Sequence, residues 1–375
     1  MSHPNHSPGG PVPDVAPPAQ TIPPPAPREV SVLPITGLPE IREGDDLGAL
    51  LARALAPLGP QDGDVLCLST KVVSKALGLR IAPEERDEAI RAAAVRTVAR
   101  RLHTRVVTSV VQIPSGPVMA AAGVDSSNAP EGPLLLPEDP DACARALRDQ
   151  LVSVLGVELG VLLTDTSSRV WRVGVGDIAL GASGVSSLQD LRGGTDADGR
   201  ALTVTVRNLA DELAAAADLV KGKASGVPAA LVRGVAAATA SDVPARQLSR
   251  TGPEDWFRRP SLESVWEALG LSAEQEPIAR MSPEPARERI DRAVGVASIP
   301  RPGQSSPSAS SRISTRPDGS THIVVEAAER SPAALIAAAT LAERIRTALG
   351  AESLSAPLPE ILVEVSVPDS QEDLS

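Results

Sequence analysis

Aromatic residues are nearly absent from this chain of 375 residues, which has three tryptophans, one phenylalanine and no tyrosine. Without a row of aromatic side chains, the protein lacks a surface on which single-stranded bases could stack. The formal net charge of −11 also leaves no basic stripe that could neutralise phosphates. We therefore expect no nucleic-acid partner and a hydrophobic core built from aliphatic side chains.

Cysteine is equally scarce. Cys67 and Cys143 are too few for a zinc framework or a disulfide scaffold, and both lie among apolar residues, so we expect them to be small core side chains. The sequence contains no run of about 18 apolar residues that would predict a membrane span. The N-terminus lacks the charged and then apolar pattern of a signal peptide. These features predict a cytoplasmic protein with no membrane partner.

Composition divides the chain into regions. Residues 1–28 are rich in proline and contain little that could be buried, so we expect a disordered tail. Residues 29–258 have the apolar density of a folded domain. Beyond it, the pattern predicts a helical extension over 259–297, a flexible linker over 298–320 and a small strand–helix–strand segment over 321–375. That last segment is too small to be very stable alone.

Strand-like and helix-like segments alternate within residues 29–258, which predicts an α/β fold whose sheet is at least partly parallel. The segment 83–103 has its acids early and its bases late, as a helix dipole favours, so we predict one long helix there. Strands are predicted at 28–38, 63–70, 116–123, 160–166, 201–208 and 228–235, and further helices at 45–59, 139–156 and 209–223.

Clusters of polar residues follow three of the predicted strands. One cluster begins at Ser69, and the others contain Asp125 and Asp165. Because a helix lies between the strands at 117–122 and 157–163, we expect these strands to run parallel through a right-handed crossover. Asp125 and Asp165 should then meet at one carboxyl edge of the sheet, where open α/β sheets bind ligands.

These residue types suit a metal and a phosphate group. Mg²⁺ or Mn²⁺ prefers hard oxygen ligands, which Asp125, Asp165 and the Thr166 hydroxyl could supply. Lys71 and Lys75 could neutralise the remaining phosphate charge. The competing interpretation is a set of ordinary surface turns, because Asp, Ser and Thr favour turns and helix caps, with one of the lysines facing solvent.

Two glycine-containing segments do not qualify as nucleotide-binding motifs. The segment 174–179 follows its strand too late to be a dinucleotide fingerprint, and 220–225 lacks the earlier glycine of a Walker loop. Trp171 allows two interpretations, a core side chain that covers a helix–sheet contact or a wall of the substrate pocket.

Six sequence blocks occur in the order and spacing of one protein family. They are GLPEIREGDDL, DGDVLCLSTKVVSKALG, AAAGVDSSN, LLPEDPDACARALR, LLTDTSSRVWRVGVGDIALG and LADELAAAADLVKGKASGVPAALVRG. Together they resemble the coenzyme F-420-0:L-glutamate ligase family. The resemblance implies a gamma-glutamyl ligase domain over residues 29–258, with a two-lobed mixed sheet, helices on its faces and no Walker loop.

The resemblance also implies an activity and its requirements. Such proteins use GTP as co-substrate and Mg²⁺ or Mn²⁺ to add L-glutamate to coenzyme F-420-0 through an acyl phosphate, and they are homodimers. The implied metal ligands are Asp125, Asp165 and Thr166. The implied nucleotide-binding residues are Leu38, Pro39, Glu40, Ile41, Thr70, Lys75, Asn128, Lys221, Gly222 and Lys223.

At several positions the chain departs from the family pattern. Ser168 replaces a glycine that would permit a positive φ, Val175 replaces a polar residue, and Val206 lies in a block that has lost a carboxylate. Lys223 stands where some relatives have a ligand for a second metal. These departures keep open a second interpretation, a catalytically degenerate relative that binds nucleotide or deazaflavin as a pathway partner. The residues after Arg250 are too few for a flavin-binding nitroreductase domain, so FMN is not expected.

Overall fold

The computed structural model describes residues 29–103, 105–127, 129–251, 262–280, 284–303, 309–317, 320–353 and 356–368. The predicted tail over 1–28 lies outside this part of the chain. Among the described residues, no helix is both long and apolar enough to cross a membrane.

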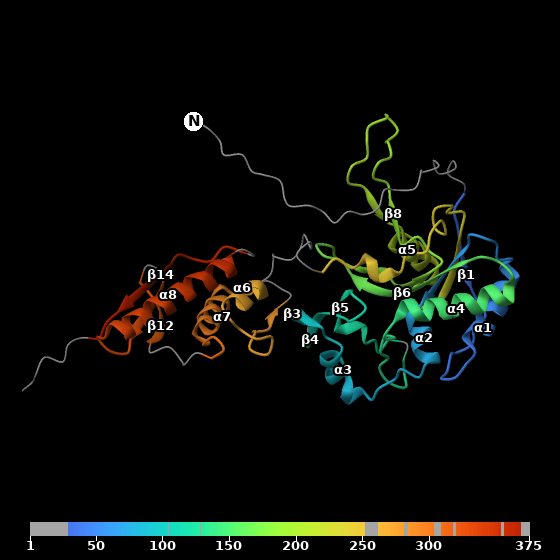
Figure 1. Ribbon diagram of the computed structural model, residues 1–375. Helices are drawn as coiled ribbons and strands as arrows, with labels where there is room; N and C mark the ends of the chain where they lie inside the picture. The colour runs from blue at the N-terminus through green and yellow to red at the C-terminus, as the bar shows by residue number, and fades with distance from the viewer. Residues whose placement is uncertain are drawn as a thin grey trace, which may run out of the picture.

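A mixed five-stranded sheet, called the central sheet below, has its strands in the order β1-β10-β2-β6-β7, and β1 and β6 are labelled at the right of Figure 1. The bounds are Ser31–Ile35 for β1, Ala229–Arg233 for β10, Val65–Ser69 for β2, Gly160–Ser168 for β6 and Val175–Ser183 for β7. The strands β2 and β6 run parallel, with Ser69 opposite Thr164. The other neighbouring pairs are antiparallel. This sheet confirms the predicted α/β fold.

Helices cover both faces of the central sheet because its strands are apolar on both sides. Leu66 and Leu68 of β2 belong to the cluster beneath α1 (Leu47–Leu55) and α4 (Pro140–Leu155). Their neighbours Val65 and Cys67 face the opposite cluster, beneath α5 (Leu209–Lys221), since side chains alternate along a strand. Cys67 is buried and Cys143 packs half-buried against the first cluster, so the prediction for both cysteines is confirmed.

A second sheet forms the other lobe and corrects two predictions. Its order is β11-β3-β4-β5, with bounds Ala279–Arg280, Arg96–His103, Val106–Gln112 and Val118–Ala120. The predicted long helix over 83–103 is therefore wrong, because α3 spans only Arg86–Ala92 and β3 follows it, paired antiparallel with β4. The predicted crossover from 117–122 to β6 is also wrong, since β5 belongs to this second sheet.

Shorter elements complete the two lobes. The helix α2 (Thr70–Ala76) starts directly after β2. The predicted strand over 201–208 is reduced to β9 (Val206–Asn208), which pairs with β8 (Leu188–Asp190). The chain between β8 and β9 projects away from the central sheet (Figure 1).

The C-terminal residues form one further unit with a core of its own, at the red end of the chain in Figure 1. Its elements are α6 (Leu262–Ala268), α7 (Ala286–Ser298), β12 (Ala309–Thr315), β13 (Thr321–Ala327), α8 (Pro332–Ser353) and β14 (Ile361–Ser366). The strand–helix–strand prediction is confirmed in β13, α8 and β14, whose strands are parallel. The linker predicted over 298–320 is wrong at 309–315, because β12 pairs along the length of β13. The helices of the predicted extension share this core as well.

Candidate nucleotide and metal site

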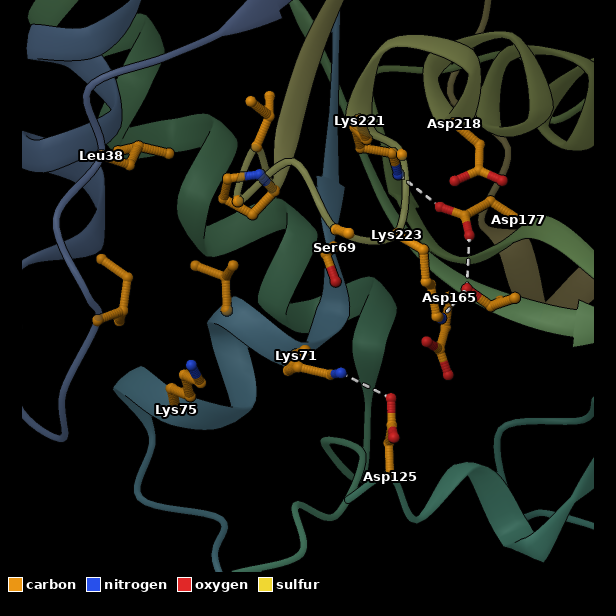
Figure 2. A pocket seen from close by; sticks show the side chains of 18 of the residues that line it. Leu38, Ser69, Lys71, Lys75, Asp125, Asp165, Asp177, Asp218, Lys221 and Lys223 are labelled. Atoms are coloured by element: carbon orange, nitrogen blue, oxygen red, sulfur yellow. Dashed lines mark hydrogen bonds and ion pairs between the residues drawn. The ribbon is translucent and has the colours of Figure 1, made fainter. Parts of the chain in front are cut away.

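A cavity of about 380 Å³ lies where β2 and β6 end beside each other (Figure 2). It brings together most of the predicted site residues although they come from five separate segments. The predicted residues that line it are Leu38, Pro39, Glu40, Ile41, Lys75, Asp125, Asp165, Thr166, Lys221, Gly222 and Lys223. Asn128 lies outside the described residues.

Thr70 is the predicted nucleotide-binding residue that the structure places apart from the cavity lining. Its side chain is fully buried, and its hydroxyl donates a hydrogen bond to the main-chain oxygen of Thr164 at 3.1 Å. This contact ties the start of α2 to β6. Ser69, the preceding residue, is the one that reaches the cavity.

Asp125 is held by a lysine and a turn. The Nζ of Lys71 lies 2.6 Å from its carboxylate, and the main-chain N–H of Ser127 donates to the same group at 2.6 Å. Burial alone would raise the pKa of Asp125, but the hydrogen bonds from Lys71 and Ser127 hold that pKa below its usual value. The Asp125 carboxylate is therefore kept ionised.

Asp165 has the opposite environment. Burial raises the pKa of its carboxyl to about 6, against a hydrogen bond from the main chain of Thr166, and the negative charges of Asp125 and Asp177 add to the rise. A cation placed between these carboxylates would relieve their repulsion. Asp125, Asp165 and the Thr166 hydroxyl therefore fit a hard divalent metal.

The donor set is small for a metal held by protein alone. Within the part of the chain that is described, no three or more His, Cys, Asp or Glu side chains form a metal-binding group. Magnesium commonly takes only one or two carboxylates and completes its shell with phosphate oxygens and water. The site thus suits a metal that arrives with a nucleotide.

Two of the residues that line the cavity, Lys221 and Asp177, form a buried ion pair, and Asp177 is the member that the sequence analysis missed. The Nζ of Lys221 is 2.5 Å from the Asp177 carboxylate and 2.7 Å from the Thr164 hydroxyl, and both charged side chains are almost fully buried. Asp177 also accepts a hydrogen bond from the Thr166 hydroxyl at 3.1 Å. Asp177 therefore orients Thr166, one of the predicted metal ligands. Reading 160–183 as a β-hairpin would have placed these two residues opposite each other.

Two further lysines face the cavity (Figure 2). Lys223 donates to the Thr166 hydroxyl at 2.9 Å, and Lys75 pairs with Glu40 of the loop after β1. Lys221 ends the helix α5 and Gly222 follows with a φ of +59°. A Walker loop would instead precede a helix, so these residues reach the cavity in a different way.

The interpretation of Trp171 as a core side chain is wrong, and the other interpretation, a wall of the substrate pocket, stays a prediction. The Trp171 side chain is 68% exposed, and it is absent from the cavity lining. The departure at Ser168 also has a simple outcome. Ser168 is the last residue of β6, opposite Val175, and the positive φ values in this turn fall on Trp171, at +62°, and Gly174, at +94°. A serine is therefore accommodated at position 168.

The chain belongs to the F420-0:Gamma-glutamyl ligase family, whose model matches residues 36–234. Its curated relatives include proteins named coenzyme F420:L-glutamate ligase. The one from Archaeoglobus fulgidus is 38% identical over 247 residues, 61% of this chain and 97% of the relative. The one from Methanopyrus kandleri is 43% identical over 216 residues, 52% of this chain and 83% of the relative. The one from Haloarcula marismortui is 38% identical over 262 residues, 64% of this chain and 97% of the relative. The resemblance inferred from the six sequence blocks is confirmed.

Proposed function

We propose that this protein is a ligase that joins L-glutamate to coenzyme F-420-0 through an amide bond, with GTP as co-substrate and GDP and phosphate as products. The relatives' names support a ligase that acts on coenzyme F420 and L-glutamate. The observation that carries the proposal is the meeting of Asp125, Asp165 and Thr166 with several lysines in one cavity. The product would be F-420-1 or a longer gamma-glutamyl chain.

The proposed reaction has two steps. A carboxylate oxygen of F-420-0 attacks the γ-phosphorus of GTP, the bond to the β-phosphate oxygen breaks, and GDP leaves. The glutamate amine then attacks the acyl carbon of the resulting acyl phosphate, loses a proton and expels phosphate. Both steps gather negative charge, which cationic side chains stabilise most effectively in a site shielded from water.

Three of the four lysines that line the cavity have a defined part in this proposal. Lys71 and Lys75 lie on α2 and point their ammonium groups at the cavity, where they would neutralise phosphate oxygens. Lys223 and the loop 38–41 border the same space and would hold the rest of the nucleotide. Mg²⁺ or Mn²⁺, held by Asp125, Asp165 and Thr166, would neutralise charge on the phosphoryl group.

The test is a GTP turnover assay with Mg²⁺ or Mn²⁺, with and without L-glutamate and F-420-0, with products followed by mass spectrometry. We expect phosphate release that requires both substrates and a deazaflavin that gains glutamyl units. Asp165→Asn should abolish turnover in a folded protein, because it removes a ligand charge. Asp149→Asn, at an exposed carboxyl on α4, is the matched control and should retain activity.

The second candidate function is a degenerate relative that binds nucleotide or deazaflavin without catalysis. The observation in its favour is that Lys71 already neutralises Asp125, a predicted metal ligand. Tight GTP binding without turnover under every combination of substrates would replace the ligase by this candidate. We further propose a homodimer, as the family resemblance implies, and light scattering would give the native mass.

A further inference from the structure

Four exposed apolar side chains gather at the tip of the β6–β7 hairpin. Val170, Trp171, Val173 and Val175 are 60%, 68%, 107% and 68% exposed, and we call these four the apolar tip. Single exposed hydrophobic residues are normal on a protein surface, but a group of them marks a place where something binds. The tip lies outside the cavity that the proposed function uses.

The backbone of the tip is strained at its only aromatic residue. Trp171 has a φ of +62°, an uncommon conformation for a bulky side chain. Strained residues of this kind persist where the surrounding structure holds them, and they concentrate at binding sites. Here the main-chain N–H of Arg172 donates to the main-chain oxygen of Arg169 at 3.2 Å and closes the turn around Trp171, while the Arg169 guanidinium donates to the main-chain oxygen of Asp177 at 3.0 Å. The tip is thus fastened to a residue of the cavity.

The hairpin also connects the tip to the cavity through a continuous face. Thr166 lies opposite Asp177, and their side chains are hydrogen-bonded. Two residues further along each strand, Ser168 lies opposite Val175. Because side chains on a strand alternate, Val175 extends the same face, about 7 Å further out. An elongated substrate lying along this face would contact the predicted metal-binding residue Thr166 at one end and apolar side chains at the other.

We propose that the apolar tip binds the flat deazaflavin ring of the acceptor while the carboxylate of the acceptor lies in the cavity. This inference rests on the proposed function, which supplies the identity of the acceptor. A planar aromatic ring stacks favourably on an indole and on aliphatic side chains. The side chain of the acceptor, which ends in the lactyl phosphate, keeps the reacting carboxylate away from the ring. The strand places Val175 about 7 Å beyond Thr166, and the rest of the tip follows in the turn of the hairpin.

The test compares Trp171→Ala, Trp171→Phe and Val204→Ala by equilibrium dialysis with F-420-0 and, separately, with GTP. Val204 is 83% exposed on a different loop and is the matched control. We expect Trp171→Ala to weaken F-420-0 binding about tenfold, the loss of one stacking contact. Trp171→Phe, which keeps an aromatic face, should weaken it much less. GTP affinity should be the same in the unchanged protein and in all three variants.

The outcomes separate this inference from the proposed function. Unchanged F-420-0 affinity in Trp171→Ala would overturn the inference, even in a protein with full ligase activity. A Trp171-dependent F-420-0 affinity would support it, even in a protein that shows no turnover. A loss of native mass in Trp171→Ala with unchanged F-420-0 affinity would also overturn it, and would assign the tip to contact with a second copy of the chain.

Discussion

Lys221 and Asp177 form a buried ion pair that holds a residue of the binding site in place, because Asp177 accepts a hydrogen bond from Thr166. Each charge is almost fully removed from water, and each has the other as its partner. A buried pair gains little over an apolar pair, but removing one member leaves the other charge without compensation. The intact pair therefore adds little net stability, whereas the loss of either member alone is costly.

For this reason we expect Asp177→Asn to lower the free energy of unfolding by about 3–5 kcal/mol. The change leaves the Lys221 ammonium buried against a neutral amide, and urea denaturation would measure the loss. The control is Glu158→Gln, which breaks the pair with Arg148 at a carboxylate that is 68% exposed. Exposed pairs contribute little, so the control should unfold like the unchanged protein. Equal urea midpoints for Asp177→Asn and Glu158→Gln would contradict this account.

The predicted site residues came together for a reason that differs from the one the sequence suggested. Asp125 and Asp165 were expected at one edge of a single sheet. They meet instead because Asp125 follows the second sheet and reaches toward β6 from the other lobe, where Lys71 holds it. The residue types were readable from the sequence, since acids and hydroxyls cluster after apolar strands. The partner that anchors Asp125 depends on how the two lobes pack, which local pattern cannot reveal.

Among the elements, β3 shows why the predicted helix over 83–103 was wrong. Alanine and arginine favour helices, and the charges were arranged as a helix dipole prefers. From Arg96 onward the chain nevertheless pairs with β4 on one side and β11 on the other. Pairing with strands that lie elsewhere in the sequence overrides a local preference. By contrast, α1, α4 and α5 were predicted well because their apolar periodicity and N-caps are local features.

Replacing a glycine by alanine is expected to have opposite effects on stability in β7 and in α7. A Cβ on Gly181 of β7 would lie 2.3 Å from the main-chain oxygen of Pro140, at the start of α4. A Cβ on Gly295 of α7 would meet nothing within 4 Å. We expect Gly181→Ala to destabilise the protein by about 1–3 kcal/mol or more through overpacking. Gly295→Ala should stabilise α7 by about 0.5–1 kcal/mol, because glycine is costly inside a helix.

Thermal denaturation of the two glycine variants would measure both effects. A Gly181→Ala variant as stable as the unchanged protein would mean that α4 can move away from β7 at no cost. A Gly295→Ala variant of lowered stability would mean that α7 needs a flexible residue at that position.

At the scale of the whole molecule, the C-terminal unit is joined to the ligase lobes by a small set of contacts. The strand β11 pairs with β3 at two positions, and Arg101 of β3 pairs with the nearly buried Glu263 of α6. We expect Arg101→Ala to speed hydrogen exchange at the β11 amides about tenfold, the loss of a charged hydrogen-bonded contact. Exchange in β6 should be unchanged, and an equal acceleration in both strands would point to general destabilisation instead.

The same junction predicts a dependence on pH. Burial, together with the charges of Glu263 and Glu267, raises the pKa of Glu276 to about 7. A carboxyl whose pKa is raised by folding contributes stability below its unfolded value, about 4.5, and that stability is lost as the pH rises through about 7. The C-terminal unit should therefore melt at a lower temperature at about pH 8 than at about pH 5. Glu276→Gln should flatten this dependence, and an unchanged slope in that variant would rule out Glu276 as its source.

The scarcity of aromatic residues has a practical consequence. With no tyrosine in the chain, ultraviolet emission from this protein comes almost entirely from tryptophan. Trp171 is 68% exposed at the hairpin tip, whereas Trp266 is 1% exposed in the C-terminal core, so the first should emit at longer wavelength than the second. Once Trp256 is replaced by phenylalanine, the red edge of the spectrum reports on the hairpin and the blue edge on the C-terminal unit. The chain thus carries its own two-colour optical reporter, without any attached dye.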